Sequence, residues 1–183
     1  MTLFPPPRCV DERDVTVELD RAIRAGLCEC FPPDFAVFSR TRAWHGSHPA
    51  WSVVVEHETQ VIAHAGIVER VILAGRQAVR VAGVQNMFVL PRYRGQGLFP
   101  QVMAEFVREA LRRRLDLGLL FCTPQIAVPY ARLGWQFVHA RRITRIDEQG
   151  EPQPLPANNV AMRYPLGRAE LPAGDVHLQG NDW

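Results

Sequence analysis

The stretch NMFVLPRYRGQGLFPQVMAEF, Asn86–Phe106, joins an apolar strand to an apolar helix through a loop rich in arginine and glycine. A turn between two such elements needs only a few polar residues and one glycine, whereas this loop contains Arg92, Arg94, Gly95 and Gly97. A strand, a tight loop and a helix N-terminus aim backbone N–H groups at one point, where the helix dipole adds positive character. Glycines let an anion approach the backbone without meeting a Cβ atom. The stretch therefore predicts an anion-binding site.

Residue periodicity predicts the elements around this loop. Leu19, Ile23 and Leu27 at four-residue spacing indicate an amphipathic helix over 17–31. The further predicted elements are strands over 51–55, 61–73 and 78–90, a helix from Leu98, a strand over 119–122, a short helix closed by Gly134, and strands over 135–140 and 160–164. The predicted irregular segments are a lead-in over 1–14, a loop over 147–159 and a tail over 167–183.

Composition limits the classes of protein to which the chain can belong. At 183 residues with 47% hydrophobic residues, it is long enough for a single domain over 1–183 with a substantial core. Its net charge of +2 is too small for the phosphate contacts of non-specific nucleic-acid binding. The sequence contains no run of ~18 apolar residues, the length that a bilayer-spanning helix needs, and its first residues lack a signal-peptide pattern. We expect neither a nucleic-acid nor a membrane partner, and a cytoplasmic location.

The four cysteines follow no metal-ligand spacing, so no metal is expected. Nucleotide motifs also fit poorly. There is no G-K-[ST] for a nucleoside triphosphate, and no G-x-G-x-x-G with a later acidic residue for a dinucleotide.

The string FVLPRYRGQGL, followed by an amphipathic helix, a short apolar strand and YARLGW, resembles the acetyl-coenzyme A binding core of GNAT N-acyltransferases. The match covers roughly Val53 to Val138. VIAHAGIVER, WHGSHP and the end LPAGDVHLQGNDW are most similar to the branch of aminoglycoside 2'-N-acetyltransferases and nodulation-factor N-acyltransferases. The resemblance implies an α/β (α+β) GNAT fold, with a mixed, mostly antiparallel, splayed central sheet flanked by helices.

The resemblance also implies acetyl-CoA as cosubstrate and a binding site for it. The coenzyme A pyrophosphate would lie on the backbone of Arg92, Tyr93, Arg94, Gly95, Gln96, Gly97 and Leu98. Met87 and Val89 would pair with the pantetheine amides as an added strand does, and N–H groups near Met87 and Phe88 would polarise the thioester oxygen. Tyr130, in YARLGW, would give a proton to the departing thiolate.

The general base is where the sequence departs from the family, because Gly83 and Gln85 stand where members often carry Glu or His. If the turn at 74–76 joins two strands without a bulge, His64 falls opposite Gln85 or Met87 and faces the acceptor site. We therefore predict His64 as the base; the alternatives are a core histidine bonded to backbone, or Glu56 or Glu69.

The resemblance, the polar and aromatic residues of the segment 34–48 and the acidic residues of the tail together predict a small-molecule amine acceptor, an amino sugar or aminoglycoside-like molecule. Gln85, Trp44, Asp182 and Trp183 are the expected acceptor-binding residues. Removing residues 175–183 would then raise the KM of the acceptor much more than that of acetyl-CoA. The alternative function is a non-catalytic CoA-binding module of the same fold. The sequence leaves open whether the chain forms a homodimer.

Overall fold

The computed structural model describes residues 4–140 and 142–183, and within this range the chain forms two compact units. The first unit contains residues up to Trp44, 48–67 and 85–109. The second contains residues 45–47, 68–84 and those from Ala110 onward. Strands β3 (Gln60–Ala74) and β4 (Gln77–Val89) contribute residues to both units. The single domain over 1–183 stays a prediction.

The strands of the first unit are antiparallel neighbours. β1 (Arg8–Asp11) pairs with β2 (Trp51–His57), and β2 pairs with the first part of β3, where Trp51 lies opposite Ile67. The prediction of an irregular lead-in over 1–14 is wrong for β1, because the strand forms by pairing with residues far along the chain.

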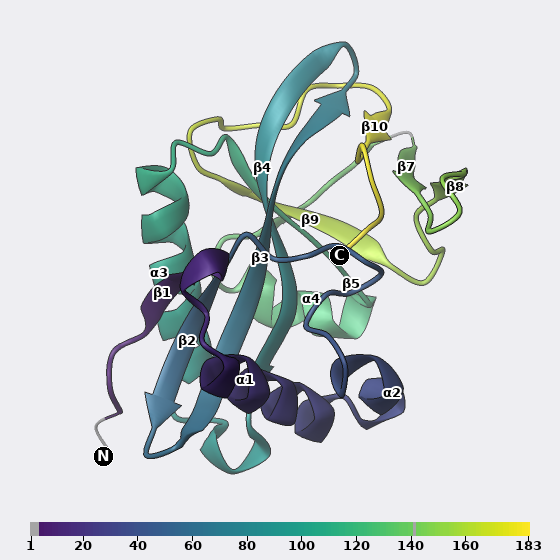
Figure 1. Ribbon diagram of the computed structural model, residues 1–183. Helices are drawn as coiled ribbons and strands as arrows, with labels where there is room; N and C mark the ends of the chain where they lie inside the picture. Colours follow the sequence, from purple (N-terminus) through teal and green to yellow (C-terminus); the bar gives the residue numbers. More distant parts are fainter. Residues whose placement is uncertain (1–3, 141) are drawn as a thin grey trace. The chain divides into compact units, whose positions relative to one another are not determined.

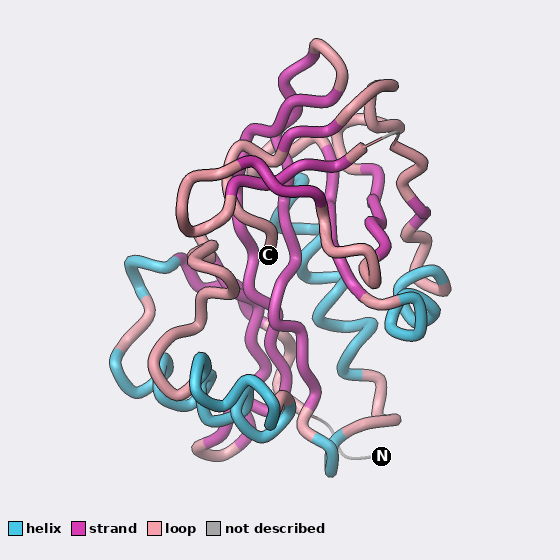
Figure 2. Tube along the Cα trace, turned by 90° about the vertical axis from the view of Figure 1, so that its right-hand side faces the viewer, coloured by secondary structure: helices cyan, strands magenta, loops and turns pink. Residues whose placement is uncertain are grey.

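The helices of the first unit lie beside its strands (Figure 2), and the sequence predicts two of them, α1 and α3. They are α1 (Val17–Cys30), the short α2 (Phe35–Phe38) and most of α3 (Leu98–Arg112). Thr16 caps α1 by accepting a hydrogen bond from the Leu19 backbone N–H at 3.2 Å, which satisfies one of its unpaired N–H groups. Gly26 lets α1 approach β4, because a Cβ there would lie 2.3 Å from the ring of Phe88.

The second unit is a mixed sheet in the strand order β6-β9-β5-β4-β3-β10-β7-β8. Its further elements are β5 (Leu117–Cys122), α4 (Pro124–Ala131), β6 (Gln136–Phe137), β7 (Ile143–Ile146), β8 (Pro152–Pro154), β9 (Val160–Pro165) and β10 (Val176–His177). β5 runs parallel to β4, and β10 runs parallel to β7. β5–β9, β6–β9, β7–β8 and β3–β10 are antiparallel. The predicted mixed, mostly antiparallel character agrees with this pattern.

The tail over 167–183 is not irregular throughout, which corrects the prediction. β10 lies between β3 and β7 (Figure 1), with Val176 opposite Ala74 of β3. Val176, Leu178 and Trp183 are buried in the core of this unit. The short β8 likewise replaces part of the loop predicted over 147–159, and β6 is shorter than the strand predicted over 135–140.

Among the helices of the described residues, none is long and apolar enough to cross a membrane.

Candidate active site

The loop after β4 has the geometry of an anion cradle. Pro91–Tyr93 form one turn of 3-10 helix, Gly95 and Gly97 adopt φ of 73° and 81°, and α3 begins at Leu98. Leu98 is buried and anchors the helix start, whereas Gly95–Gly97 are exposed. A Cβ built on Gly95 meets no atom within 4 Å, so the space beside the backbone is open. The first turn of α3 directs its N–H groups toward this loop, as an anion site requires.

Side chains hold the loop in place and supply its charge. Arg94 Nε donates to the carbonyl of Val89 at 3.0 Å, and Gln96 Nε2 donates to the carbonyl of Arg92 at 3.2 Å. Arg92 bonds to Gln60 and lies over the ring of Tyr93, 5.1 Å from its centroid. Both arginines are exposed, so their charge is available to an anion at the loop.

The end of β4 departs from regular strand geometry at Asn86, whose φ is 52°. Asn86 Nδ2 donates to the carbonyl of Arg42 at 2.7 Å, and the Trp44 N–H donates to Gln85 Oε1 at 3.0 Å. These bonds fasten the segment Arg42–Trp44 to β4. Gln85 and Trp44, both predicted to bind the acceptor, are therefore in contact. The side-chain oxygen of Gln85, Oε1, already accepts a hydrogen bond from the Trp44 N–H.

His64 is a core residue at 1% exposure and does not present a ring nitrogen to solvent. Its Nδ1 donates to the carbonyl of Asn86 at 3.0 Å, so its Nε2 accepts from Ser52 Oγ, at 3.3 Å. The ring stacks on Phe88 at 5.5 Å. Burial, the largest cause, lowers the pKa of His64 to about 3. The geometry thus disfavours His64 as general base and supports the alternative of a core histidine bonded to backbone.

The burial of neutral His64 predicts a pH-dependent stability. The pKa of His64 falls from its ordinary value of 6.5 to about 3 on folding, so the unfolded chain binds the proton more readily. The stability contributed by the neutral ring is fully present above the unfolded value and is lost as the pH falls toward 3. We expect the free energy of unfolding, from urea titrations at successive pH values, to fall over this window. The variant His64→Gln should show a shallower fall, and an equal slope in both proteins would contradict the assignment.

The alternative carboxylates are held in ion pairs. Glu56 pairs with Arg8 at 2.5 Å, and Glu69 pairs with Arg113 at 3.0 Å. Neither arrangement suits a group that must accept a proton from a substrate.

Tyr130, in the second unit, lies on α4 and is 8% exposed. Its ring meets Trp135 edge to face at 5.7 Å. Burial, and secondarily Cys122, raise the pKa of Tyr130 above its ordinary value, while burial raises the pKa of the Cys122 thiol to about 11. Tyr130 therefore keeps its hydroxyl proton, as a proton donor or relay must.

Trp183, predicted to bind the acceptor, is instead part of the core of the second unit. The residue is 4% exposed, and its ring packs on Phe121 at 5.1 Å and under Arg70 at 5.1 Å. Its Nε1 donates to the carbonyl of Leu119 at 3.3 Å. A Cβ on Gly83 would lie 2.2 Å from this ring, so glycine there makes room for the tryptophan. Removing residues 175–183 would take out core side chains, so an effect mainly on the acceptor KM is no longer expected.

Asp182 carries a buried carboxylate whose side chain is 2% exposed. Asp182 Oδ1 lies 2.9 Å from His45 Nδ1 and 3.3 Å from Arg145 Nη1. His45 follows Trp44 in the chain, and its partner Asp182 lies 137 residues further along the sequence, so no local pattern indicates this pair.

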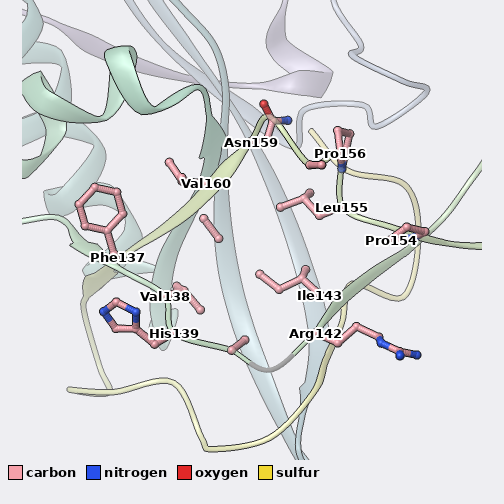
Figure 3. Close-up of a pocket in the computed structure, with 13 residues that line it drawn as sticks. Phe137, Val138, His139, Arg142, Ile143, Pro154, Leu155, Pro156, Asn159 and Val160 are labelled. Atoms are coloured by element: carbon pink, nitrogen blue, oxygen red, sulfur yellow. The ribbon is translucent and has the colours of Figure 1, made fainter.

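A separate cavity of about 500 Å³ lies in the second unit (Figure 3). Its lining residues are Phe137, Val138, His139, Ala140, Arg142, Ile143, Pro154, Leu155, Pro156, Ala157, Asn159, Val160 and Ala161. Among these lining residues there is none that the sequence predicts to bind acceptor or cosubstrate. In the described ranges, 4–140 and 142–183, no group of three or more His, Cys, Asp or Glu residues could hold a metal ion.

The loop geometry and the sheet agree with one family. A family model described as an acetyltransferase (GNAT) domain matches residues 17–138. The chain belongs to the GNAT acetyltransferase family. This GNAT is 31% identical over 128 residues to an aminoglycoside 2'-N-acetyltransferase of Mycolicibacterium fortuitum, a match that covers 70% of the chain and 63% of the relative. The chain thus spans less than two thirds of that relative's length.

Solved structures confirm the predicted fold. A GNAT family N-acetyltransferase from Escherichia coli (YhbS) in complex with CoA has a TM-score of 0.62 at 16% identity, covering 98% of this chain and 92% of the other. A GNAT family acetyltransferase from Brucella melitensis in complex with acetyl-CoA has a TM-score of 0.60 at 18% identity, covering 93% and 94%. The α+β GNAT fold with a mixed sheet is therefore shown.

Proposed function

We propose that this GNAT transfers an acetyl group from acetyl-CoA to a primary amine of a small molecule, an amino sugar or aminoglycoside-like acceptor. The observation that carries the proposal is the cradle after β4, where two glycines at positive φ, exposed arginines and a helix start occur in one loop. The acceptor class is supported by the 31% identical relative named as an aminoglycoside 2'-N-acetyltransferase.

In this function the loop residues Arg92–Leu98 hold the pyrophosphate, and Met87, Phe88 and Val89 lie along the pantetheine. The Val89 carbonyl already accepts a bond from Arg94 Nε, which links the strand end to the loop. Acetyl-CoA supplies the activated thioester, and no metal is needed for its attack by an amine. Tyr130 supplies a hydroxyl proton to the departing sulfur, because burial keeps that hydroxyl neutral. The four cysteines form no disulfide, which favours a reducing, cytoplasmic location.

The proposal is tested by following CoA release from acetyl-CoA with a panel of amines. Amino sugars and aminoglycosides should support turnover, whereas a peptide N-terminus or lysine should not. Thiol release with peptides alone would overturn the acceptor class and leave acetyl transfer standing.

The variant Gly97→Val tests the cradle directly. Its φ of 81° is costly for a β-branched residue, so the loop must rearrange and CoA affinity should fall about tenfold or more. The free energy of unfolding should fall only by this backbone strain, because the loop is exposed and no core contact is lost. Calorimetric titration with CoA measures the affinity.

The matched control for this variant is Gly150→Val, which imposes the same change at a φ of 83° in the turn between β7 and β8. A Cβ built on Gly150 meets no atom within 4 Å, and one built on Gly97 lies 3.6 Å from Gln101 Nε2, an ordinary contact. CoA affinity unchanged in Gly97→Val would show that the loop does not hold the pyrophosphate.

A second candidate function is a CoA-binding module that transfers nothing. It is favoured by the burial of His64 and by the absence of a carboxylate at Gly83 and Gln85 on β4. CoA binding without thiol release for any amine in the panel would establish it.

A further inference from the structure

Three rings from separate parts of the first unit meet at the loop after β4. The ring of Tyr93, inside the loop, lies 5.6 Å from the ring of Phe4 and 6.1 Å from that of His57 between centroids. Phe4 and His57 also meet each other at 5.5 Å, and all three pairs are close to edge to face. Aromatic pairs with this geometry and separation attract one another. These three residues form an aromatic cluster that lies within the first unit.

Tyr93 is the side chain that fastens the loop to the rest of the unit. Of the residues from Pro91 to Gly97, all of which the structure describes, only Tyr93 is half-buried, and the others are exposed. Gly95 and Gly97 add backbone freedom to this exposed segment. A loop that must become ordered when a ligand binds loses affinity, and a loop that is ordered beforehand avoids this loss. The contacts of the Tyr93 ring therefore bear on the affinity of the cradle for an anion.

The turn between β2 and β3 supports the loop at two points. His57, the last residue of β2, contributes its ring to the cluster. Gln60, the first residue of β3, accepts a hydrogen bond from Arg92, whose guanidinium lies over the Tyr93 ring at 5.1 Å. Both supports come from a strand hairpin that neighbours the end of β4.

Phe4 reaches the cluster on a stiff segment. Residues 5–7 are all prolines and separate Phe4 from Arg8, the first residue of β1. Proline fixes φ, so this short connection has little conformational freedom. Arg8 lies opposite Val54 of β2 and donates a hydrogen bond to Glu56 at 2.8 Å. The pairing of β1 with β2 thus fixes the start of the segment that delivers Phe4 to Tyr93.

We propose that Phe4 is a positioning residue for the cosubstrate: it holds Tyr93, and through Tyr93 it keeps the loop in the conformation that receives the pyrophosphate of CoA. This inference rests on the proposed use of acetyl-CoA by the loop. It adds a residue from the segment before β1, which does not contact the glycines of the cradle but acts on them through one ring.

Phe4→Ala tests the positioning role. The dissociation constant of CoA, measured by calorimetric titration, should rise about fivefold, because two aromatic contacts are lost and the loop must be ordered on binding. The KM of acetyl-CoA should rise by a similar factor at an unchanged kcat, because the reacting groups are untouched. Phe4→Tyr keeps the ring and should restore the wild-type affinity. The matched control is Phe35→Ala, which removes a ring of α2 that is 59% exposed, and should leave CoA affinity unchanged.

A double-mutant cycle shows whether Phe4 acts through Tyr93. In the Tyr93→Ala background the partner ring is absent, so adding Phe4→Ala should cause no further loss of CoA affinity. A fivefold rise of the dissociation constant in both backgrounds would overturn the proposed route.

S-Acetylpantetheine, which carries the same thioester without the pyrophosphate, separates the loop from the rest of the site. With this donor, Phe4→Ala and the wild-type protein should have equal kcat/KM values, because neither can use the cradle. A defect as large as that with acetyl-CoA would overturn the inference.

The wild-type titration distinguishes this inference from the function on which it rests. CoA binding by the wild-type protein together with an unchanged dissociation constant in Phe4→Ala would overturn the positioning role and leave the proposed function standing. A lower kcat at an unchanged KM would also overturn it, because that result indicates a loss of folded protein. No CoA binding by the wild-type protein would overturn the proposed function, and the inference with it.

Discussion

Replacing Tyr130 with phenylalanine should lower kcat about 10²-fold, which is the usual contribution of a positioned proton donor. The buried ring would be retained, so its contact with Trp135 and the CoA affinity should stay near the wild-type values. Only the hydroxyl that protonates or stabilises the departing thiolate would be lost. Steady-state kinetics with acetyl-CoA and an aliphatic amine measure the change.

Tyr164→Phe is the matched control for this prediction. Tyr164 also packs against Trp135, at 5.6 Å between ring centroids, and belongs to β9 of the same unit. Both substitutions remove one phenolic oxygen beside the same indole, and only the Tyr130 variant should lose turnover. Equal kcat values for the two variants would assign Tyr130 to packing.

Replacing Trp183 with alanine should lower the free energy of unfolding by about 3–5 kcal/mol, the cost of truncating a large buried aromatic residue. The ring fills a site bounded by Phe121, Arg70 and Gly83, and its Nε1 bonds to the Leu119 carbonyl. Urea denaturation of the wild-type and variant proteins measures the loss. A midpoint equal to that of the wild-type protein would contradict the buried position of this residue.

A double-mutant cycle with Gly83→Ala sharpens this test. In the wild-type background a Cβ at Gly83 meets Trp183 at 2.2 Å, so the alanine should be strongly destabilising. In the Trp183→Ala background that clash is absent, and the same alanine should cost little. The sum of the stability losses in the two single variants should therefore exceed the loss in the double variant. Additive losses would show that the two positions are not in contact.

Local patterns predict α1 and the loop after β4 in the first unit, because these are determined by neighbouring residues, whereas β1 depends on pairing with β2. The spacing of Leu19, Ile23 and Leu27 predicts α1, and all three side chains are buried. The glycines of the loop predict a backbone that only glycine adopts readily, and both have positive φ.

Long-range pairing explains what local patterns miss. β10 is formed by two residues whose partners lie in β3 and β7, and nothing in VH alone indicates a strand. Trp183 follows polar residues in the sequence, which suggests an exposed side chain. Its ring is instead buried, in space that the absence of a side chain at Gly83 leaves open. In the sequence, Gly83 stands at a position where family members often carry a general base. In the structure, its lack of a side chain leaves space for the indole of Trp183.

The orientation of His64 depends on a strand irregularity that the sequence does not specify. A bulge-free hairpin predicts a ring that faces the acceptor, but Asn86 adopts positive φ and its carbonyl accepts a hydrogen bond from His64 Nδ1. A single residue of irregularity is enough to redirect a side chain in a strand.

The division of the chain into two units has a consequence for synthesis on the ribosome. Residues 1–109 contain every segment of the first unit, whereas the second unit also needs residues from Ala110 onward. The segment 68–84 is therefore translated well before β5 and β10, the strands that flank it. Until those neighbours emerge, the nascent chain presents the apolar side chains of Val68, Ile72 and Val79 without their core partners.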